Sequence, residues 1–424
     1  MNDAPLNDTI DHLFRQESGK MVAVLVKIFG SEHYSLAEDV VQEALIKALQ
    51  SWKFGGIPNN PSAWLYRTAR NKAIDLIRKK KHELAFDFTL PDLQLLKSEY
   101  TLGVTMNTFW EEDRIKDDFL AMMFACCHPD ISAENQITFI LKSLCGFSTR
   151  EIARAFITSE DTISKRVYRT KEYFRKNKLR PQIPDKSELH NRMEGVLQTI
   201  YLMFNEGYNS TQQESLIRKD VIEQAMHLCQ SLIEHPQTQI PEAYALMALM
   251  CLHTARLDSR LSTNGDLILL ANQDRTLWND ELIKKGSAYL IKSAEGEILS
   301  IFHIEAAIAY THCSAKKYED TDWKGILSYY DMLLKIAPNV VTELNRSVAV
   351  LELHGPEEAF KSLQPLVSSK PLQTYYPYHV VLGEIYARLG EDVLACESFE
   401  KAIICTVSAQ EKEFMEQKIL KFKA

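Results

Sequence analysis

A polar stripe along one predicted helix has the residue types to contact a nucleic acid. Four side chains recur at helical spacing over residues 61–81 and therefore share one face: Arg67, Asn71, Asp75 and Arg78. The opposite face is apolar, and the segment ends in a run of Arg and Lys. Guanidinium and ammonium groups bind backbone phosphates, whereas an asparagine amide can read base edges. The stripe suits nucleic-acid binding, although an ordinary solvated helix face has the same pattern.

A second basic segment has the pattern of a helix-turn-helix. Ser148 and Glu151 have the spacing of a capping box that opens one short helix, and Ser159 can cap the next. In that second helix four side chains are expected to face inward: Ile163, Val167, Thr170 and Phe174. Four others are expected to face outward: Thr162, Arg166, Arg169 and Tyr173. Two short helices with a tight turn and a basic second helix are typical of a DNA reader. A plain helical hairpin with a charged surface is the alternative.

The distribution of charge along the chain supports a confined polyanion-binding surface. Residues 141–180 hold 11 basic and 4 acidic side chains, a balance of +7. The balance is +2 over residues 1–180 and −10 over residues 181–424. We therefore expect a nucleic-acid-binding N-terminal part beside a C-terminal part with no affinity for nucleic acid.

Catalytic and metal-binding motifs are missing from the sequence. Cys126, Cys127 and His128 are adjacent, whereas zinc ligands usually come in spaced pairs with a second pair elsewhere. Buried thiols are the leading interpretation of these residues, and a redox or metal switch is the alternative. The chain has no phosphate-binding loop, nucleophile elbow or zinc-protease motif. We expect no enzymatic activity, no cofactor and no metal.

Composition and patterning favour an all-α protein of several domains. The 424 residues are 46% hydrophobic and 25% charged, as in ordinary globular proteins. Apolar residues recur at helical spacing, and strand-like alternation is scarce. The sequence has no apolar run that could span a bilayer, no secretory signal and no disulfide framework. These features predict a cytoplasmic protein without a membrane partner.

The helices that position the two polar segments can be placed in outline. The first is expected over about residues 9–29, with an inner face of Ile10, Leu13, Phe14, Met21, Leu25 and Ile28. The second opens at a capping-box pattern, Ser35 to Glu38, and Asn60 can cap the third. Residues 83–113 lack clear periodicity and read as an extended acidic linker, within which Leu93, Leu95 and Leu96 could form a short docked turn.

The C-terminal part shows weak internal repetition. A unit of roughly 34 residues beginning at Tyr376 fits a tetratricopeptide pattern. Its packing positions are Leu382, Gly383, Tyr386, Ala395, Phe399 and Ala402. Two further candidate units fit less well, and ordinary paired helices could produce the same pattern.

Three segments in order resemble bacterial sigma factors of the extracytoplasmic-function (ECF) type. Residues 37–44, AEDVVQEA, resemble the helix that binds the polymerase clamp. Residues 63–78 resemble the adjoining helix that recognises the −10 promoter element, and residues 147–176 are similar to the −35-reading domain. The resemblance covers roughly residues 10–180 and implies two small helical domains joined by a short linker.

The remaining sequence resembles one ECF subgroup that carries a long tetratricopeptide-like C-terminal extension. The motifs that carry this resemblance are residues 126–129 (CCHP), 192–197 (RMEGVL), 201–208 (YLMFNEGY) and 273–278 (QDRTLW). The implied domains are sigma domain 2 over residues 1–82, the linker over 83–113, sigma domain 4 over 114–180, and a helical regulatory domain over 187–424.

The resemblance also implies roles for individual residues. The β and β′ subunits of RNA polymerase core are the implied protein partners, and the polymerase-binding residues are Asp39, Gln42 and Glu43. The implied −10 DNA contacts are Trp64, Arg67, Asn71, Arg78, Lys79 and Lys80, although Trp64 also suits a packed core position. The implied −35 DNA contacts are Ser159, Glu160, Asp161, Thr162, Lys165, Arg166 and Arg169.

The predicted function is promoter-specific transcription initiation, modulated by a C-terminal domain that binds a protein or ligand partner. The alternative is a stand-alone helix-turn-helix regulator whose helical-repeat domain acts as a sensor. A helical scaffold with an incidental basic surface is a third interpretation, and it would have no salt-dependent affinity for DNA.

Overall fold

The protein is built from α-helices, as the hydrophobic spacing predicts. The computed structural model describes residues 4–80, 91–156, 158–210, 217–262, 267–406 and 408–423. Within these ranges there is no β-strand, and one isolated antiparallel bridge joins Leu261 to Leu267. None of the helices described there is long and apolar enough to cross a bilayer. The predicted all-α fold class is confirmed.

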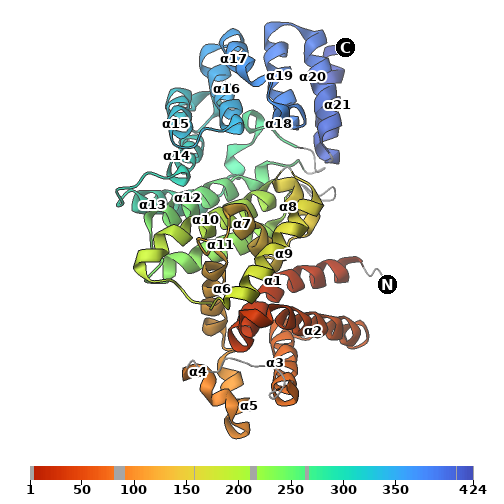
Figure 1. The fold of residues 1–424 in the computed structure, drawn as a ribbon. Coiled ribbons are helices and arrows are strands. Elements are labelled where there is room, and N and C mark those ends of the chain that lie inside the picture. Colours follow the sequence, from red (N-terminus) through yellow and green to blue (C-terminus); the bar gives the residue numbers. More distant parts are fainter. Residues whose placement is uncertain are drawn as a thin grey trace. The chain divides into compact units, whose positions relative to one another are not determined.

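The chain forms two compact units, residues 1–203 and residues 204–424, and the boundary falls inside helix α10. Unit 1 contains the three N-terminal segments predicted from the sequence. Its helices (Figure 1) are α1 (Ala4–Phe29), α2 (Tyr34–Gly55), α3 (Pro61–Lys80), α4 (Pro91–Gln94), α5 (Glu99–Thr108), α6 (Glu112–Cys126), α7 (Ala133–Ser143), α8 (Thr149–Ala155), α9 (Glu160–Asn177) and α10 (Lys186–Tyr208), with 3-10 turns η1 (Ser31–His33) and η2 (Leu95–Lys97).

Helices α1, α2 and α3 pack against one another through apolar faces. In α3 the buried face consists of Leu65, Ala69, Ala73 and Ile77. The Trp52 ring of α2 lies 5.4 Å from the Trp64 ring of α3 and 6.1 Å from the Phe14 ring of α1. This aromatic group fixes the end of α2 against the start of α3.

Helix α1 is buried around its whole circumference in its second half. The predicted inner residues Met21, Leu25 and Ile28 are fully buried. So are residues on the other side of the helix, namely Val22, Ala23, Val24, Val26 and Phe29. A helix that is apolar on all sides must be covered on all sides. The single inner face that we expected for this helix is therefore incomplete.

Most of the predicted helix caps are present. The Asn60 side chain accepts a hydrogen bond from the backbone amide of Ala63 at 2.9 Å. Ser148 and Glu151 form the predicted capping box, and the Ser159 hydroxyl accepts from the amide of Thr162. The box expected at Ser35 is not formed, because α2 begins at Tyr34 without a side-chain cap.

The segment predicted as an extended linker is partly helical. Residues 81–90 lie outside the described part of the chain, and the remainder folds into α4, η2 and α5. Leu93 and Leu96 are buried, as expected of a docked turn, whereas Leu95 is exposed. Burial of Leu102, Met106 and Phe109 explains why a helix forms where the sequence shows little periodicity.

Unit 2 is a series of packed helices, in which neighbours along the chain form most of the contacts. Its helices are α11 (Lys219–Glu234), α12 (Pro241–Thr254), α13 (Asp280–Ser293), α14 (Ile301–Ser314), α15 (Trp323–Ile336), α16 (Val340–His354), α17 (Pro356–Leu363), α18 (Lys370–Gln373), α19 (Tyr376–Leu389), α20 (Asp392–Cys405) and α21 (Ala409–Lys423). The 3-10 turns are η3 (Leu257–Ser259), η4 (Leu270–Asn272), η5 (Arg275–Leu277), η6 (Tyr318–Asp320) and η7 (Gln364–Leu366).

The best predicted repeat corresponds to the hairpin of α19 and α20. Gly383 faces Phe399 so closely that an added Cβ would lie 2.6 Å from the ring. Ala395, Phe399 and Ala402 are fully buried beside Met415 of α21. The small and large packing positions expected from the sequence are therefore used as such in this hairpin.

His312 is a buried imidazole in the core of unit 2. Its side chain meets the Trp323 ring edge-on at 5.3 Å, and its Nδ1 has no hydrogen-bond partner in the described structure. Burial, together with the smaller effect of the nearby guanidinium groups of Arg256 and Arg275, lowers the pKa of His312 to about 3. The imidazole is therefore neutral at neutral pH.

Unit 2 should lose stability as the pH falls from about 6.5 toward 3, because the unfolded chain takes up a proton that folded His312 cannot hold. His312→Gln should reduce this dependence and leave the part due to His253, whose pKa is also lowered to about 3, whereas His354→Gln, at an exposed position, should not change it. Urea unfolding at several pH values, followed by hydrogen exchange of unit 2 peptides, measures the slope. Equal slopes in both variants would contradict this assignment.

Candidate nucleic-acid interface

Helix α3 presents the predicted polar stripe to solvent. Arg67, Asn71, Asp75, Arg78 and Lys79 are all exposed, opposite the buried face that packs on α1 and α2. Lys80 ends the helix, and its side chain lies outside the described residues. The stripe thus brings cationic groups and one amide together on a single accessible face.

The linker helix α5 borders this stripe. Arg70 donates hydrogen bonds to the side chains of Asn71 and Asn107, and Asn107 belongs to α5. Arg78 lies 3.9 Å from Glu99 at the start of α5, in a pair that is exposed on both sides. An acidic linker residue therefore occupies the position near Arg78 that a phosphate would take.

Trp64 lies at the edge of the stripe and serves the packing of the domain. Its half-buried ring packs edge-on against Trp52, and its carbonyl accepts a hydrogen bond from the Thr68 hydroxyl. The packing role is one of the two that the sequence allowed. A DNA contact by the exposed part of this ring stays a prediction.

Helix α2 carries the predicted polymerase-binding residues on its outer face. Asp39, Gln42 and Glu43 are exposed, whereas Val40, Val41 and Ala44 are buried. Glu43 forms an ion pair with Lys72 of α3, which places this face beside the α3 stripe. Phe54, in the last turn of α2, is 88% exposed and has room to stack on an unpaired base.

Helices α8 and α9 pack against each other as the predicted pair. At the start of α9, Ser159, Glu160 and Asp161 are exposed, and Thr162 is half-buried. Lys165 and Arg169 are exposed one and two turns later, and Lys165 pairs with Asp161 at 2.7 Å. The exposed N-terminal end of α9 therefore combines short polar side chains with cations, as recognition of base edges and phosphates requires.

Arg166 is less accessible than the sequence pattern predicts. Its guanidinium lies 5.4 Å from the centre of the Phe156 ring, and its Nη1 is buried without a hydrogen-bond partner in the described structure. The charge is held against α8, so Arg166 also contributes to packing. Its neighbour Arg169 is the freer of the two arginines.

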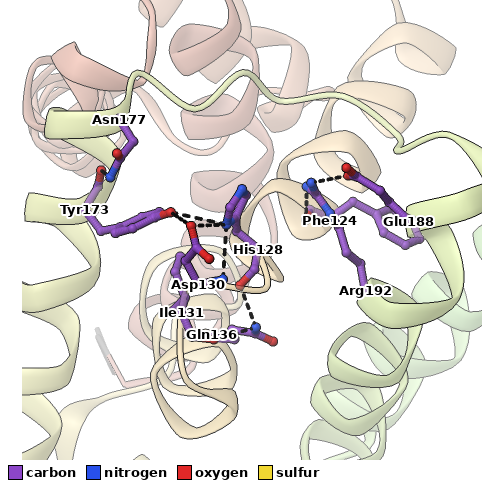
Figure 2. A network of polar contacts seen from close by, with 9 residues as sticks. All are labelled: Phe124, His128, Asp130, Ile131, Gln136, Tyr173, Asn177, Glu188 and Arg192. Atoms are coloured by element: carbon purple, nitrogen blue, oxygen red, sulfur yellow. Dashed lines mark hydrogen bonds and ion pairs between the residues drawn. The ribbon is translucent and has the colours of Figure 1, made fainter.

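Tyr173 anchors α9 and does not face solvent freely, contrary to our expectation. Figure 2 shows its hydroxyl between Asp130 and His128, in the loop that joins α6 to α7. The hydroxyl donates to the Asp130 carboxylate at 2.8 Å and lies 3.3 Å from His128 Nδ1. Gln136 holds the same loop by donating to the carbonyls of His128 and Ile131.

The cysteines of the CCHP motif are buried thiols. Cys126, Cys127 and Cys145 are inaccessible, and burial raises the pKa of Cys127 and of Cys145 to about 12. Among the described residues no group of three metal-binding side chains occurs. The prediction that these thiols are buried is confirmed, and His128 of the motif contacts Tyr173 of α9.

Helix α10 supplies contacts whose role the sequence did not reveal. Arg192 reaches the Phe124 carbonyl at the end of α6 and pairs with Glu188 (Figure 2). Gly195 faces Cys127 so closely that an added Cβ would lie 2.8 Å from the sulfur. The sequence contained one signal for this contact, namely Gly195 in the middle of a predicted helix. A glycine at such a position marks a place where another segment approaches the helix closely.

Comparison with known proteins matches two parts of the chain to protein families. Sigma-70 region 2 matches residues 13–83, which hold α2, α3 and most of α1. A family of unknown function, DUF6596, matches residues 192–294. Residues 192–294 of the C-terminal part are thus similar to that family, and a tetratricopeptide subgroup is not identified by this comparison.

Two relatives are similar over longer stretches. The uncharacterized protein R00370 of Rhizobium meliloti is 33% identical over 384 residues, which are 91% of this chain and 89% of the relative. The ECF RNA polymerase sigma factor SigW of Bacillus subtilis is 26% identical over 163 residues, which are 37% of this chain and 82% of SigW. No solved structure matches the chain.

Arg169→Ala should reduce the salt dependence of binding to duplex DNA by about one unit of slope, because it removes about one phosphate contact. Arg166→Ala should reduce the same slope and should in addition lower the free energy of unfolding of the α8–α9 pair, because the Arg166 guanidinium packs on Phe156. Fluorescence anisotropy at several salt concentrations measures the slope. Lys401→Ala, at an exposed position in unit 2, is the control; an unchanged slope for Arg169→Ala would refute the contact.

Proposed function

This chain belongs to the same family as the Rhizobium meliloti protein R00370, and we propose that it is an ECF-type sigma factor. It carries sigma-70 region 2, and this match coincides with the helices that expose the α3 stripe and the α2 outer face. That coincidence is the observation that carries the proposal. The chain would bind RNA polymerase core and direct it to one class of promoters.

Helices α2 and α3 would open the −10 element. Promoter opening requires a base to leave the stack, which costs a few kcal/mol and needs a receiving site. The exposed Phe54 ring offers a stacking surface, and the exposed Asn71 amide offers hydrogen bonds. Arg67, Arg78, Lys79 and Lys80 would hold the phosphates around that base.

Helix α9 would read the −35 element. Its N-terminal residues Glu160, Asp161 and Thr162 would enter the major groove, with Ser159 beside the backbone. Lys165, Arg166 and Arg169 would hold phosphates on either side. The local excess of positive charge supports this role, since seven net positive charges fall within residues 141–180.

The outer face of α2 would bind the polymerase. Asp39, Gln42 and Glu43 present two carboxylates and an amide on one exposed face, which suits pairing with basic side chains of the β′ clamp. The acidic linker, with Glu111, Glu112 and Asp113 at its end, would follow polymerase channels that otherwise hold nucleic acid. Such a factor acts where the polymerase is, in the cytoplasm.

Unit 2 would regulate this activity by binding a protein or small ligand. It contains a cavity of about 490 Å³ lined in part by aromatic rings of Tyr318, Trp323 and Tyr330. Charged residues that line the cavity form ion pairs with one another. For example, Arg388 pairs with Glu352 at 2.5 Å. No enzymatic role is part of this proposal.

A stand-alone DNA-binding regulator with a sensor domain is the second candidate. The pairing of α8 and α9 favours it as much as it favours a sigma factor. The two candidate functions differ in one requirement: a sigma factor needs the α2 outer face to bind polymerase, and a stand-alone regulator does not.

The double variant Asp39→Ala with Gln42→Ala should weaken binding to bacterial RNA polymerase core about tenfold or more, because two exposed polar contacts of about 1 kcal/mol are lost. Pull-down of core by the full chain measures this. Glu413→Ala with Glu416→Ala, an exposed acidic pair on α21, is the matched control. Retained binding in the first variant, or no binding by the wild-type chain, would favour the stand-alone regulator.

Asn71→Ala should slow promoter opening about tenfold while duplex affinity stays within about twofold, because its amide would contact only an extruded base. Permanganate footprinting on a promoter selected with the holoenzyme reports the unpaired thymines. Asp75→Ala, one turn further along the same exposed stripe, is the comparison. Equal loss of duplex binding and opening would reject the base-specific role.

A further inference from the structure

The cavity of unit 2 has the size and the enclosure of a small-molecule site. Its volume is about 490 Å³, and such sites usually measure roughly 300–1,000 Å³. Its walls come from helices α15, α16, α19 and α21, from the end of α14, from the turn η6 and from residues 269–272. All of these elements belong to unit 2, so the site is complete within this unit.

Part of the lining is a cluster of aromatic rings. The Trp323 ring meets the His312 ring edge-on at 5.3 Å and the Tyr318 ring edge-on at 5.4 Å. Tyr330 and Val348 also line the cavity. Trp323 and Tyr318 are only half-buried, so part of each ring remains available for a further flat ring to pack on. This part of the lining therefore favours a ligand that contains an aromatic ring.

Another part of the lining carries two ion pairs that share helix α19. Arg388 pairs with Glu352 of α16 at 2.5 Å. Glu384, one turn earlier in α19, pairs with Lys418 of α21. The charges of these four side chains cancel. Ion pairs that reach solvent contribute little to stability, so a ligand can replace one partner of such a pair at small cost.

Glu352 has a second polar neighbour that can hold it when Arg388 turns to a ligand. Burial and, to a smaller extent, the Glu352 carboxylate raise the pKa of the Tyr318 hydroxyl, which therefore stays protonated and can donate to Glu352. The Arg388 side chain is 44% exposed, so its guanidinium has room to turn. Arg388 is thus the cation best placed to receive an anionic group of a ligand.

Beside the aromatic rings lies a buried positive charge that lacks a counter-ion. Arg256 is only 8% exposed, and its guanidinium has neither a hydrogen bond nor an ion pair in the described part of the chain. Its contact is with the Trp278 ring, whose centre is 5.3 Å away. Burial and then the charge of Arg256 lower the pKa of His312, which places this charge close to the cavity lining.

An unpaired buried charge is costly, and in a native protein it calls for a compensating group. An anion in the cavity would supply this compensation from across the His312 ring. His312 itself is buried, and its Nδ1 also has no hydrogen-bond partner among the described residues. Two polar groups without partners thus lie at the same end of the cavity.

The charges favour an anion with a single negative charge. Arg256 adds one positive charge next to a lining whose own charges cancel, and this attracts an anion. The carboxylates of Glu352 and Glu384 remain in the cavity, so a doubly charged phosphate ester would be repelled. A carboxylate also matches the group that Arg388 already binds.

We propose that this cavity binds a small aromatic carboxylate, whose ring packs on Trp323 and Tyr318 and whose carboxylate takes Arg388 from Glu352. Arg256 favours this anion by its charge and does not touch it. The inference names the class of ligand that regulates unit 2. Its regulatory role rests on the proposed sigma function, whereas the binding itself does not.

Isothermal titration of the full chain with 2-naphthoate tests the ligand class. This acid should bind at least about tenfold more tightly than its neutral isostere 2-naphthamide and its dianionic analogue 2-naphthyl phosphate, because only the acid offers a single negative charge. Acetate, which lacks the ring, should bind at least about tenfold more weakly as well. The proposal is overturned if any of these three compounds binds as tightly as 2-naphthoate, or if 2-naphthoate does not bind.

Arg388→Met tests the site, because it removes the proposed carboxylate partner at an exposed position. It should weaken binding of 2-naphthoate at least about tenfold. Lys401→Met, which removes a cation at an exposed position of α20 away from the cavity lining, should leave the affinity unchanged. Equal affinities of the two variants would show that the acid binds elsewhere and would reject this site.

Arg256→Met tests the buried charge, with an outcome that a purely structural role would not give. The variant should weaken binding of 2-naphthoate at least about threefold and should raise the melting temperature, because an unpaired buried charge is removed. If Arg256 serves only to pack on Trp278, the same variant should lower the melting temperature and leave the affinity unchanged. That second result would overturn the role of Arg256.

Binding to bacterial RNA polymerase core, measured in parallel, separates this inference from the proposed function. Saturating 2-naphthoate should change the affinity of the full chain for core at least about threefold, and an unchanged affinity would overturn the regulatory role. If the chain binds 2-naphthoate but not core, the sigma function fails and the ligand site stands. If it binds core but not 2-naphthoate, the ligand site alone fails.

Discussion

Helix α1 buries side chains on every side between Met21 and Phe29, so it requires two partners where an amphipathic helix requires one. The helices α2 and α3 cover one side, and α6 with the α7–α8 turn covers the other. A strongly apolar surface cannot stay in water without cost. The close packing of the two N-terminal domains follows from this constraint.

Charged residues then divide into those that hold the domains together and those left at the surface. Glu38, Asp118 and Glu151 are engaged by Lys171, Lys27 and Arg15, each between segments far apart in the sequence. Asp39 and Gln42, beside Glu38, remain exposed. One turn of α2 thus contains both an internal contact and the proposed polymerase-binding face.

In unit 2 the QDRTLW motif has a structural role that fits its residue types. Arg275 donates to the carbonyls of His312 and Ala315 and lies over the Trp278 ring at 4.6 Å. The Trp278 indole donates to Ser259 at 2.8 Å. Arginine suits this position because its planar fork can bind two carbonyls while it stacks. The motif therefore ties η5 to the end of α14.

The sequence by itself determined the all-α class, the caps at Asn60, Ser148 and Ser159, and the exposed stripe on α3, because these depend on local spacing and hydrogen bonding. It did not determine that Val22 and Val26 are buried, that Glu38 binds Lys171, or that Tyr173 is anchored by His128 and Asp130. Valine and glutamate have the same local preferences whether a distant helix covers them or not. Only the tertiary structure decides such contacts, since their partners lie from about 40 to more than 130 residues away.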